Sequence, residues 1–386
     1  MSYLLTEEQE SLRQMVRRLV EEKVAPGAAE REEKGEYPWD IVEIFREHGL
    51  FALFIPEEYG GQGGRVLDQV VVAEEVAKGC NSSAAVLSFG NLGPVPILLG
   101  GSEEQKRKYL PRMASGELLG AYALSEPEAG SDAASLQTRA ILEGNNYVLS
   151  GRKIFISNFD AASIVIVFAR TDPQARPARG ISAFVLEKEP DQVPPGISDL
   201  RSLPKMSMRA MHTFEFAMDD LRIPKENLLG KEGEGFKYAL ATLDRGRMIV
   251  GAQGVGTAQA ALDYAVNWAK QRVQFGRPIG ALQGVQFMLA DMATEIEAAR
   301  QLVYLAAAHC DRGGPDIAYY GAIAKLFATD VAMKATTEAV QVLGGYGYIK
   351  DHPVERWMRD AKAMQIYEGT NQVQRVVIAR RLLGRL

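Results

Sequence analysis

The stretch IYEGTNQVQR (366–375) places one carboxylate, Glu368, between a tyrosine and a Gly-Thr pair. The local pattern predicts a helix break followed by a new helix start. Gly369 suits a left-handed cap, and Thr370 suits the N-cap of a helix running on to Leu383. In that interpretation Glu368 is a solvated end residue. The window alone does not decide between this interpretation and a functional carboxylate.

A second candidate is the string LSEPEAGSDAASLQT (124–138), which leaves a predicted strand with two carboxylates, a glycine and a Ser-Asp pair. One interpretation is a loop followed by a helix N-cap at Ser131 or Asp132. The other is a ligand loop, whose amides and the hydroxyls of Ser125 and Ser131 would face a flat polar ring or a phosphate chain.

The segment RVQFGRPIGALQGVQF (272–287) interrupts a helical pattern, and Pro278 forces the chain to turn there. Arg272 and Gln283 flank the turn. An arginine and an amide in such a place can bind a pyrophosphate and a purine edge. The alternative is a surface helix hairpin.

Glycines cluster in QVLGGYGYIKDHPVERWMRDAK (341–362), which contains Gly344-Gly345 and then Gly347. The spacing is not GxGxxG after a strand, so a Rossmann site is excluded. A helix cap and turn, or bare backbone open to a ligand, both remain.

The composition of the 386 residues narrows the class of protein. The net charge of −5 argues against a constitutive nucleic-acid binder. Cys80, Cys310 and four scattered histidines form no metal-ligand spacing or disulfide framework, which fits a reducing cytoplasm. The N-terminus lacks a signal-peptide core, and no apolar run suits a bilayer span. We therefore expect a soluble cytoplasmic protein with no metal site and no membrane or nucleic-acid partner.

The hydrophobic period changes twice along the chain. Helical patterns fill residues 1–118, where Thr6 and Gln9 form a possible capping box. Short alternating strands fill 119–232, beginning with a strand over 121–127, and predict an antiparallel barrel or sandwich. From 233 to 386 the helical period returns and predicts a four-helix bundle. Its expected apolar faces are Val285, Met288, Met292, Ile296, Ala299 and Val303, and then Ile323, Leu326, Phe327 and Val331.

With these motifs in order, the sequence resembles the acyl-CoA dehydrogenase family along essentially its whole length. The matching motifs are AYALSEPEAGSD (121–132), GRKIFISN (151–158), RIPKENLLG (222–230), LDRGR (243–247), RVQFGRPIGALQ (272–283), QVLGGYGY (341–348) and RDAKAMQIYEGTNQVQR (359–375). Each motif is modest alone, but seven in the same order are highly specific.

The resemblance implies FAD between the β domain and the C-terminal helices, with a neighbouring subunit completing the site. The flavin ring would lie against Tyr122, Leu124, Ser125, Phe155 and Ser157. Phe155 stands where the family often has tryptophan, which keeps a stacking face and loses the indole N–H. Across the subunit interface, Arg272, Phe275 and Gln283 would reach the pyrophosphate and adenosine. The rest of the FAD site would come from Gln341, Gly344, Gly345, Thr370 and Gln372.

The resemblance also gives Glu368 a role. It would be the base that removes a proton from the carbon next to the thioester carbonyl, while hydride leaves the β carbon for the flavin and trans-2-enoyl-CoA forms. An apolar substrate would desolvate the carboxylate and raise its pKa. The expected substrate-binding residues are Ser131, Asp244, Arg247, Tyr367 and Gly369.

One departure from the family pattern and one matching segment refine the expectation. Some family members carry the base immediately before the arginine that corresponds to Arg247, but here that position is Gly246. Glu368 is therefore the candidate at either position. The segment SSAAVLSFG (82–90) should line the end of the acyl pocket, where Phe89 would shorten it and favour short or short branched acyl groups.

The resemblance implies electron-transfer flavoprotein as the electron acceptor and a homo-oligomer, at least a dimer and by family habit a tetramer built as a dimer of dimers. Two alternatives remain. One is an oxidase or monooxygenase on the same scaffold, which oxygen consumption would reveal. The other is a non-catalytic scaffold or nucleic-acid-binding relative, which would need a basic groove or an extra domain.

Overall fold

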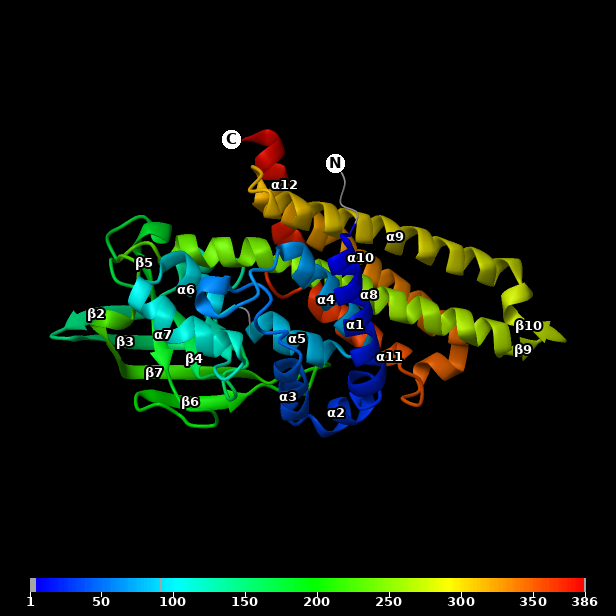
Figure 1. Ribbon diagram of the computed structural model, residues 1–386, viewed down its shortest axis with the longest axis horizontal. Helices are drawn as coiled ribbons and strands as arrows, with labels where there is room; N and C mark the ends of the chain where they lie inside the picture. The colour runs from blue at the N-terminus through cyan, green and yellow to red at the C-terminus, as the bar shows by residue number, and fades with distance from the viewer. Residues whose placement is uncertain (1–4, 91, 385–386) are drawn as a thin grey trace.

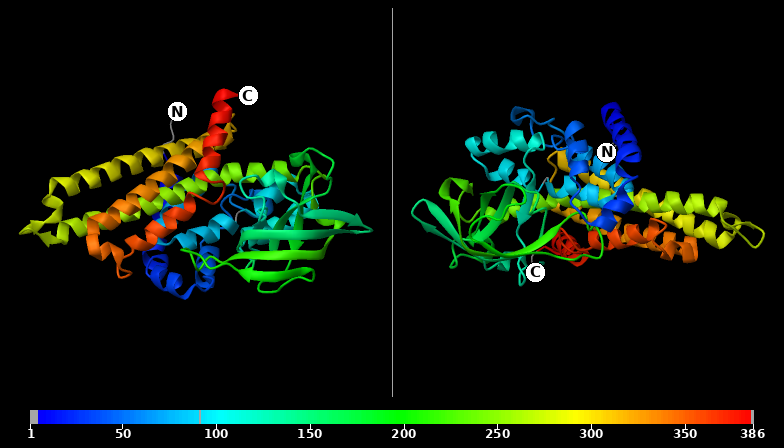
Figure 2. Two further views of the ribbon diagram at one scale, coloured as in Figure 1. Left: turned by 180° about the vertical axis from the view of Figure 1, so that it is seen from behind. Right: turned by 90° about the horizontal axis from the view of Figure 1, so that it is seen from below.

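A computed structural model describes residues 5–90 and 92–384 of the chain. Helices come first, a β-sheet follows, and long helices complete the fold (Figure 1). This order confirms the predicted fold class of a β middle region between two helical regions. The views of Figure 2 show the sheet beside the N-terminal helices and the long helices extending away from both.

The N-terminal region contains helices α1 (Glu7–Leu19), α2 (Ala28–Lys34), α3 (Trp39–Glu47), α4 (Val66–Gly79), α5 (Asn81–Gly90), α6 (Pro94–Gly100) and α7 (Glu103–Ala114). The predicted capping box of α1 is present, because the Thr6 hydroxyl accepts from the Gln9 N–H and the Gln9 side chain accepts from the Thr6 N–H. The helix α2 was not predicted. The stretch 81–100 is long enough and apolar enough to cross a membrane, but 71% of its most apolar window is buried in the fold.

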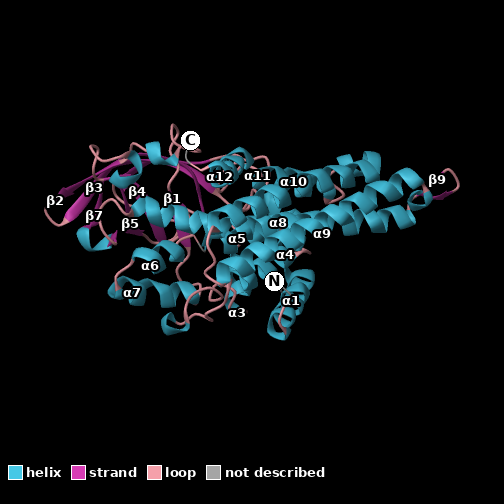
Figure 3. Ribbon diagram, turned by 90° about the horizontal axis from the view of Figure 1, so that it is seen from above, coloured by secondary structure: helices cyan, strands magenta, loops and turns pink. Residues whose placement is uncertain are grey.

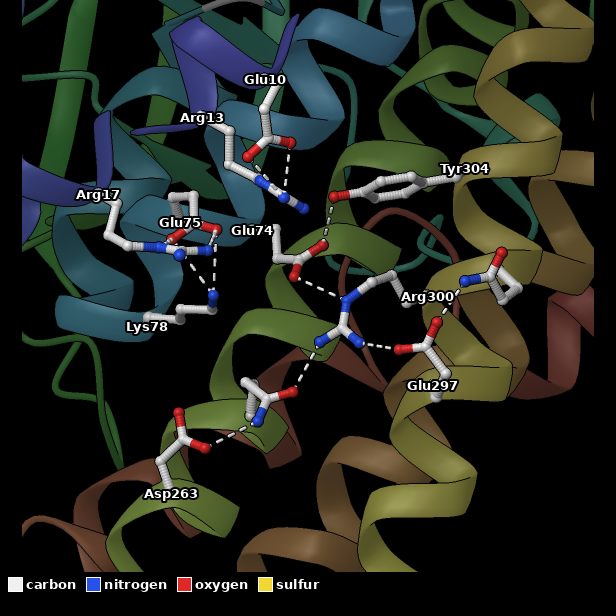
Figure 4. A network of polar contacts seen from close by, with 12 residues as sticks. Glu10, Arg13, Arg17, Glu74, Glu75, Lys78, Asp263, Glu297, Arg300 and Tyr304 are labelled. Atoms are coloured by element: carbon white, nitrogen blue, oxygen red, sulfur yellow. Dashed lines mark hydrogen bonds and ion pairs between the residues drawn. The ribbon is translucent and has the colours of Figure 1, made fainter. Parts of the chain in front are cut away.

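Buried charges join this region to the long helices (Figure 4). Two neighbouring glutamates of α4, Glu74 and Glu75, pair with different helices. The Glu74 carboxylate accepts from Arg300 Nε at 2.9 Å and from the Tyr304 hydroxyl at 2.9 Å, both on α9 (Gln283–Asp311). The Glu75 carboxylate pairs with Arg17 of α1 at 2.9 Å. Because Glu74 and Glu75 are only 3% and 1% exposed, these pairs satisfy charges that would otherwise be costly to bury.

The sheet is built from β1 (Gly120–Ala123), β2 (Arg139–Glu143), β3 (Asn146–Ser157), β4 (Ile164–Arg170), β5 (Ile181–Glu187), β6 (Ile197–Ser202), β7 (Thr213–Pro224) and β8 (Leu228–Leu229). Its order is β6-β7-β3-β2-β4-β5-β8, with β1 paired to β4. Most pairs are antiparallel as predicted. The β1–β4 pair and the single β2–β4 contact are parallel, so the sheet is mixed.

The predicted first strand, 121–127, is too long. β1 ends at Ala123, and the Leu124 carbonyl instead accepts from the buried Lys153 Nζ at 3.1 Å. The contact with Lys153 replaces strand pairing at Leu124, where the candidate ligand loop (124–138) begins. The turn around Gly144 joins β2 to β3 as predicted, with a φ of +60° at the glycine.

The C-terminal region contains α8 (Gly235–Gln271), α9, α10 (Ile317–Leu343), α11 (Val354–Met364) and α12 (Asn371–Leu383). The helix α10 packs against all four others. On α9 the predicted face is confirmed: Met292, Ile296, Ala299 and Val303 are buried, and Val285 and Met288 pack against them.

The predicted face of α10 is wrong. Of the four residues, Val331 is buried, Ile323 and Leu326 are half-buried, and Phe327 is 39% exposed. The buried residues are mostly small, with Lys325 and three larger apolar residues among them: Gly321, Ala322, Ala324, Lys325, Ala328, Thr329, Val331, Ala332, Ala335, Thr336, Ala339, Val342 and Leu343. Small side chains let α10 lie close to α8, and the larger apolar residues were mistaken for the packing face.

The two ends of the molecule are far apart. The sheet lies at one end of the longest axis, and a hairpin of β9 (Val273–Gln274) and β10 (Arg277–Pro278) lies at the other (Figures 1 and 3). The hairpin joins α8 to α9, so the candidate residues around Arg272 stand at the tip of the long helices.

Candidate active site

The backbone at Glu368 has an uncommon conformation. Glu368 has a φ of +52° and Gly369 a φ of +88°, so two left-handed residues follow each other between α11 and α12. For a residue with a side chain this costs on the order of 1–3 kcal/mol. The predicted helix start is confirmed, because the Thr370 hydroxyl accepts from the Val373 N–H at 3.2 Å. The break is therefore a shaped turn rather than a frayed helix end.

The Glu368 side chain is directed toward α8. A Cβ atom added to Gly246 would lie only 2.0 Å from Glu368 Oε2, so the glycine makes room for the carboxylate. Glu368 Oε2 is buried and has no hydrogen-bond partner among the described residues. The interpretation of Glu368 as a solvated end residue is wrong.

Burial raises the pKa of Glu368 to about 7, and the positive charges of Lys325 and Arg247 oppose part of that rise. A carboxyl group in this range is partly ionised near neutral pH and can accept a proton. An unpaired oxygen, a raised pKa and a pocket together mark a candidate for acid–base chemistry.

Glu368 borders a cavity of about 240 Å³ whose walls are largely apolar. Its lining includes Phe54, Ser88, Leu92, Val95, Gly246 and Ile249. The rings of Phe89 and Tyr367 meet edge to face at 5.7 Å between centroids. The Tyr367 hydroxyl donates to Gln253 Oε1 at 2.8 Å, and Gln253 Nε2 donates to the Ser88 hydroxyl at 2.6 Å.

Asp244 and Arg247 are neighbours on α8, with Arg247 Nη1 2.6 Å from Asp244 Oδ1. Arg247 is 5% exposed, and its Nε has no hydrogen-bond partner among the described residues. Burial lowers the pKa of Arg247 and raises that of Asp244, while each partner's charge opposes the shift. Ser131 is exposed on the loop after β1.

The predicted flavin-facing residues lie on β1, β3 and the loop after β1. The Tyr122 hydroxyl is buried with no partner among the described residues, and burial followed by the charge of Glu368 raises its pKa. Phe155 has a φ of +60° and is 67% exposed. Ser157 shares a hydrogen bond of 3.1 Å with the Thr213 hydroxyl. The exposed Phe155 ring offers a stacking group to a ligand, and the Tyr122 hydroxyl offers a polar one.

Sequence reasoning missed the anchor of this loop. Lys153 Nζ donates to Glu126 Oε1 at 2.8 Å, and the Ile154 N–H donates to the Ser125 carbonyl at 3.1 Å. Lys153 is 0% exposed, and burial lowers its pKa to about 8, against the opposing charge of Glu126. The loop is therefore fixed to β3 from Leu124 to Glu126.

The remaining candidates lie at the far tip. Arg272, Gly344 and Gly345 line one cavity of about 400 Å³, and the Arg272 guanidinium lies 5.1 Å from the centre of the Tyr346 ring. Phe275 is 89% exposed, and Gln283 and Gln341 are exposed as well. Gly344 and Gly345 thus lie with Arg272, not with Thr370 and Gln372, which are beside Glu368.

The separation follows from α10. Lys325 Nζ contacts the Gly369 carbonyl, whereas Leu343, at the other end of the helix, lines the tip cavity. Leu343 follows Lys325 by 18 residues, which is a rise of about 27 Å along a helix. One chain therefore holds the predicted residues as two separate groups.

Sequence reasoning also missed Lys325. It is 0% exposed, and its Nζ donates to the Gly369 carbonyl at 2.9 Å and to Asn371 Oδ1 at 2.8 Å. Burial lowers its pKa to about 7, with Glu368 opposing that shift. Lys325 lies within a repeat of alanines and threonines spaced three or four residues apart. This repeat is a sequence signal that could have placed the lysine on the packing face of α10.

Comparison with known proteins gives a consistent result. Three family models match: acyl-CoA dehydrogenase N-terminal domain over residues 6–117, middle domain over 121–221 and C-terminal domain over 233–383. An acyl-CoA dehydrogenase of Bacillus subtilis (strain 168) is 48% identical over 382 residues, covering 98% of this chain and 99% of the relative.

Two solved structures are also similar. One is the butyryl-CoA dehydrogenase of Megasphaera elsdenii, with a TM-score of 0.94, 45% identity and coverage of 99% of this chain and 100% of that one. The other is a chain from a structure described as the electron transferring flavoprotein of Acidaminococcus fermentans, in work on flavin-based electron bifurcation. Its TM-score is 0.95, with 47% identity and full coverage of both chains.

Proposed function

Because the chain belongs to the acyl-CoA dehydrogenase family, we propose that it oxidises short acyl-CoA esters to trans-2-enoyl-CoA with FAD as cofactor and Glu368 as base. As a member it is an oxidoreductase acting on CH–CH groups. The observation that carries the choice of base is Glu368 Oε2, which is buried, has no hydrogen-bond partner among the described residues and lies at the edge of a largely apolar cavity.

In the proposed reaction, Glu368 takes the proton from the carbon next to the thioester carbonyl, and the Cα–H electron pair forms the new C=C bond as hydride leaves the β carbon. Burial favours this step because a carboxylate surrounded by apolar groups gains more from protonation than one in water. The backbone N–H of Glu368 is proposed to donate to the thioester carbonyl and stabilise its developing negative charge. Arg247 and Asp244 border the base on α8, and Ser131 would contact the CoA moiety.

The residues present fit a flavin dinucleotide. The exposed Phe155 ring, the unpaired Tyr122 hydroxyl and the anchored loop at Leu124 and Ser125 suit a flat polar ring. Ser157, Thr370 and Gln372 are proposed to complete the flavin end of the FAD site. When bound, FAD supplies the acceptor for the hydride.

The nucleotide half is proposed to come from a second copy of the chain. Arg272, with the bare backbone of Gly344 and Gly345, suits a pyrophosphate, and Phe275, Gln283 and Gln341 are exposed beside it. These residues stand at the far tip, so the chain would use them to complete a partner's site. We propose a homo-oligomer of at least a dimer and, by family habit, a tetramer.

The acyl chain length of the substrate and the identity of the electron acceptor are further proposals. The small volume of the cavity beside Glu368, about 240 Å³, favours short acyl chains, and the similar butyryl-CoA dehydrogenase supports that choice. Electron-transfer flavoprotein is the proposed acceptor, supported by the similar chain in the Acidaminococcus fermentans structure. A cytoplasmic location is proposed with it.

The test is a visible spectrum of the purified protein under nitrogen, followed by titration with acyl-CoA esters of increasing length. A yellow protein bleached by short esters, and less by long ones, is the expected result. Bleaching by long esters alone would contradict the size assignment. A yellow protein that no acyl-CoA ester bleaches would contradict the substrate class, and a colourless protein that cannot take up FAD would contradict the cofactor.

A further inference from the structure

Lys325 is a buried cation that the proposed reaction does not use directly. It lies on the packing face of α10, among alanines and threonines, and its side chain crosses to the turn that carries Glu368. Its Nζ donates to the Gly369 carbonyl at 2.9 Å and to Asn371 Oδ1 at 2.8 Å. A lysine with no exposed surface is uncommon unless it is paired or functional.

The contacts of Lys325 belong to a group of hydrogen bonds that hold the chain from Glu368 to Asn371. Gln374 Nε2 donates to the Gly369 carbonyl at 2.8 Å and to the Glu368 carbonyl at 3.3 Å. Asn371 Nδ2 donates to Asp330 Oδ1 at 2.7 Å and to the Thr329 hydroxyl at 2.9 Å. The turn that holds Glu368 and Gly369 at positive φ is thus fixed to α10 and to the first turns of α12.

We propose that Lys325 is a positioning residue for the base: it holds the strained Glu368–Gly369 turn through the Gly369 carbonyl and supplies a positive charge that favours the ionised Glu368 carboxylate. This inference rests on the proposed role of Glu368. It assigns the buried lysine two separable tasks, one geometric and one electrostatic.

The electrostatic task has a definite sign. Glu368 acts as a base only when ionised, so the reaction rate rises with pH as its carboxyl group loses a proton. A nearby cation lowers the pKa of a carboxyl group, and its removal moves that rise to higher pH. The titratable groups around the turn are Arg247 and Asp244 of α8, Lys325 and Asp330 of α10, Tyr122 of β1, and Tyr367 and Asp360 near the turn. The two tyrosines stay neutral because burial raises the pKa of both. Arg247 remains when Lys325 is replaced, and Lys325 itself loses its charge as pH rises because burial lowers its pKa to about 7, so the shift is partial.

The test compares Lys325→Met, Lys325→Gln and the control Lys334→Met. Methionine removes both the charge and the donor, whereas glutamine removes the charge and keeps a donor. Lys334 lies on the same helix but is 53% exposed and pairs with Glu295. The rate of flavin bleaching by butyryl-CoA is measured under nitrogen between about pH 5.5 and 9. Melting temperature and FAD absorbance establish that each variant is folded and loaded.

We expect Lys325→Met to lower the high-pH rate about tenfold or more and to move the midpoint of the pH profile upward by about one unit. Lys325→Gln should move the midpoint similarly and lose less of the high-pH rate. Lys334→Met should match the wild type. If Lys325→Met does not fold, the glutamine variant alone decides the electrostatic task.

A lowered rate with an unmoved midpoint in both Lys325 variants would overturn the proposal, because a structural defect alone predicts it. An unchanged rate and midpoint would overturn it as well. Glu368→Gln is measured alongside to separate the two claims. If that variant still bleaches at the wild-type rate, the proposed base is wrong; if it is inactive while the Lys325 variants are unaffected, only the role of Lys325 fails.

Discussion

The two groups of predicted site residues, one at each end of α10, differ in how complete they are within one chain. At the Glu368 end, the base stands at the edge of a cavity, and its turn is held by Lys325 and Gln374. At the other end, Arg272 lines a cavity open to solvent, and two aromatic side chains of the same region, Phe275 and Tyr348, are 89% and 86% exposed. Large aromatic side chains on a surface indicate a ligand or a protein interface.

We infer that one chain supplies all of the proposed acid–base group but only part of the proposed nucleotide site. A buried carboxylate can be tuned by groups of its own chain, because the desolvation and the opposing charges come from the same fold. An exposed arginine and aromatic ring become a binding site only when something covers them. We therefore expect mutations at the two ends to differ in kind.

The largest effect should come from Glu368→Gln. Glutamine is nearly the same size but cannot accept the proton, so we expect flavin bleaching by butyryl-CoA to slow by about 10²–10⁴-fold or more. Folding, colour and acyl-CoA binding should persist. Glu338→Gln, a half-buried glutamate elsewhere on α10, is the control and should bleach at the wild-type rate. If the Glu368→Gln variant turned over at the normal rate, the proposal that the base lies at this end of α10 would be wrong.

The sequence predicted the fold well where side-chain type decides structure. The capping box at Thr6, the turn at Gly144 and the buried face of α9 follow from local hydrogen bonding and hydrophobic spacing. The face of α10 was mistaken because close helix packing favours alanine over the larger residues that hydrophobic spacing selects. The domain limits at 118/119 and 232/233 stay a prediction.

The site was predicted unevenly for the same reason. Glu368 and the loop at Ser125 were proposed from their motifs, but the lysines that support them, Lys325 and Lys153, were not singled out. Their burial depends on contacts between residues far apart in the chain, such as Lys325 with Gly369. The separation of Arg272 from Thr370 likewise follows from the length of α10, which no local pattern contains.

An intermediate effect should come from Arg272→Ala, which removes a cation from the tip cavity. We expect FAD to bind about tenfold more weakly or worse, because a charge-assisted contact with a phosphate is lost. The measurement is FAD retained after dialysis, with Lys270→Ala as the control, since Lys270 is an exposed cation nearby on α8. Equal retention by both variants would contradict a phosphate contact at Arg272.

The same variant tests whether the two ends belong to different copies. Arg272→Ala and Glu368→Gln chains are expressed together, at an FAD concentration that leaves Arg272→Ala alone empty. A mixed dimer then contains one site with an intact base and an intact tip, so random pairing should restore about a quarter of wild-type activity. If both ends acted within one chain, mixing would restore nothing.

The smallest effect should be that of Phe275→Ala on the stability of the apoprotein. An exposed side chain contributes little to folding, so we expect the melting temperature of dilute apoprotein to change by about 1 °C or less. Phe184→Ala is the matched change at the sheet end, where the ring is 0% exposed and packs 4.8 Å from Tyr147. Truncating a buried phenylalanine costs about 3–5 kcal/mol. A Phe275→Ala loss that equals the Phe184→Ala loss at every protein concentration would mean that the tip is packed within its own chain. A loss that grows with protein concentration would instead mean that a second copy already covers the tip before FAD binds.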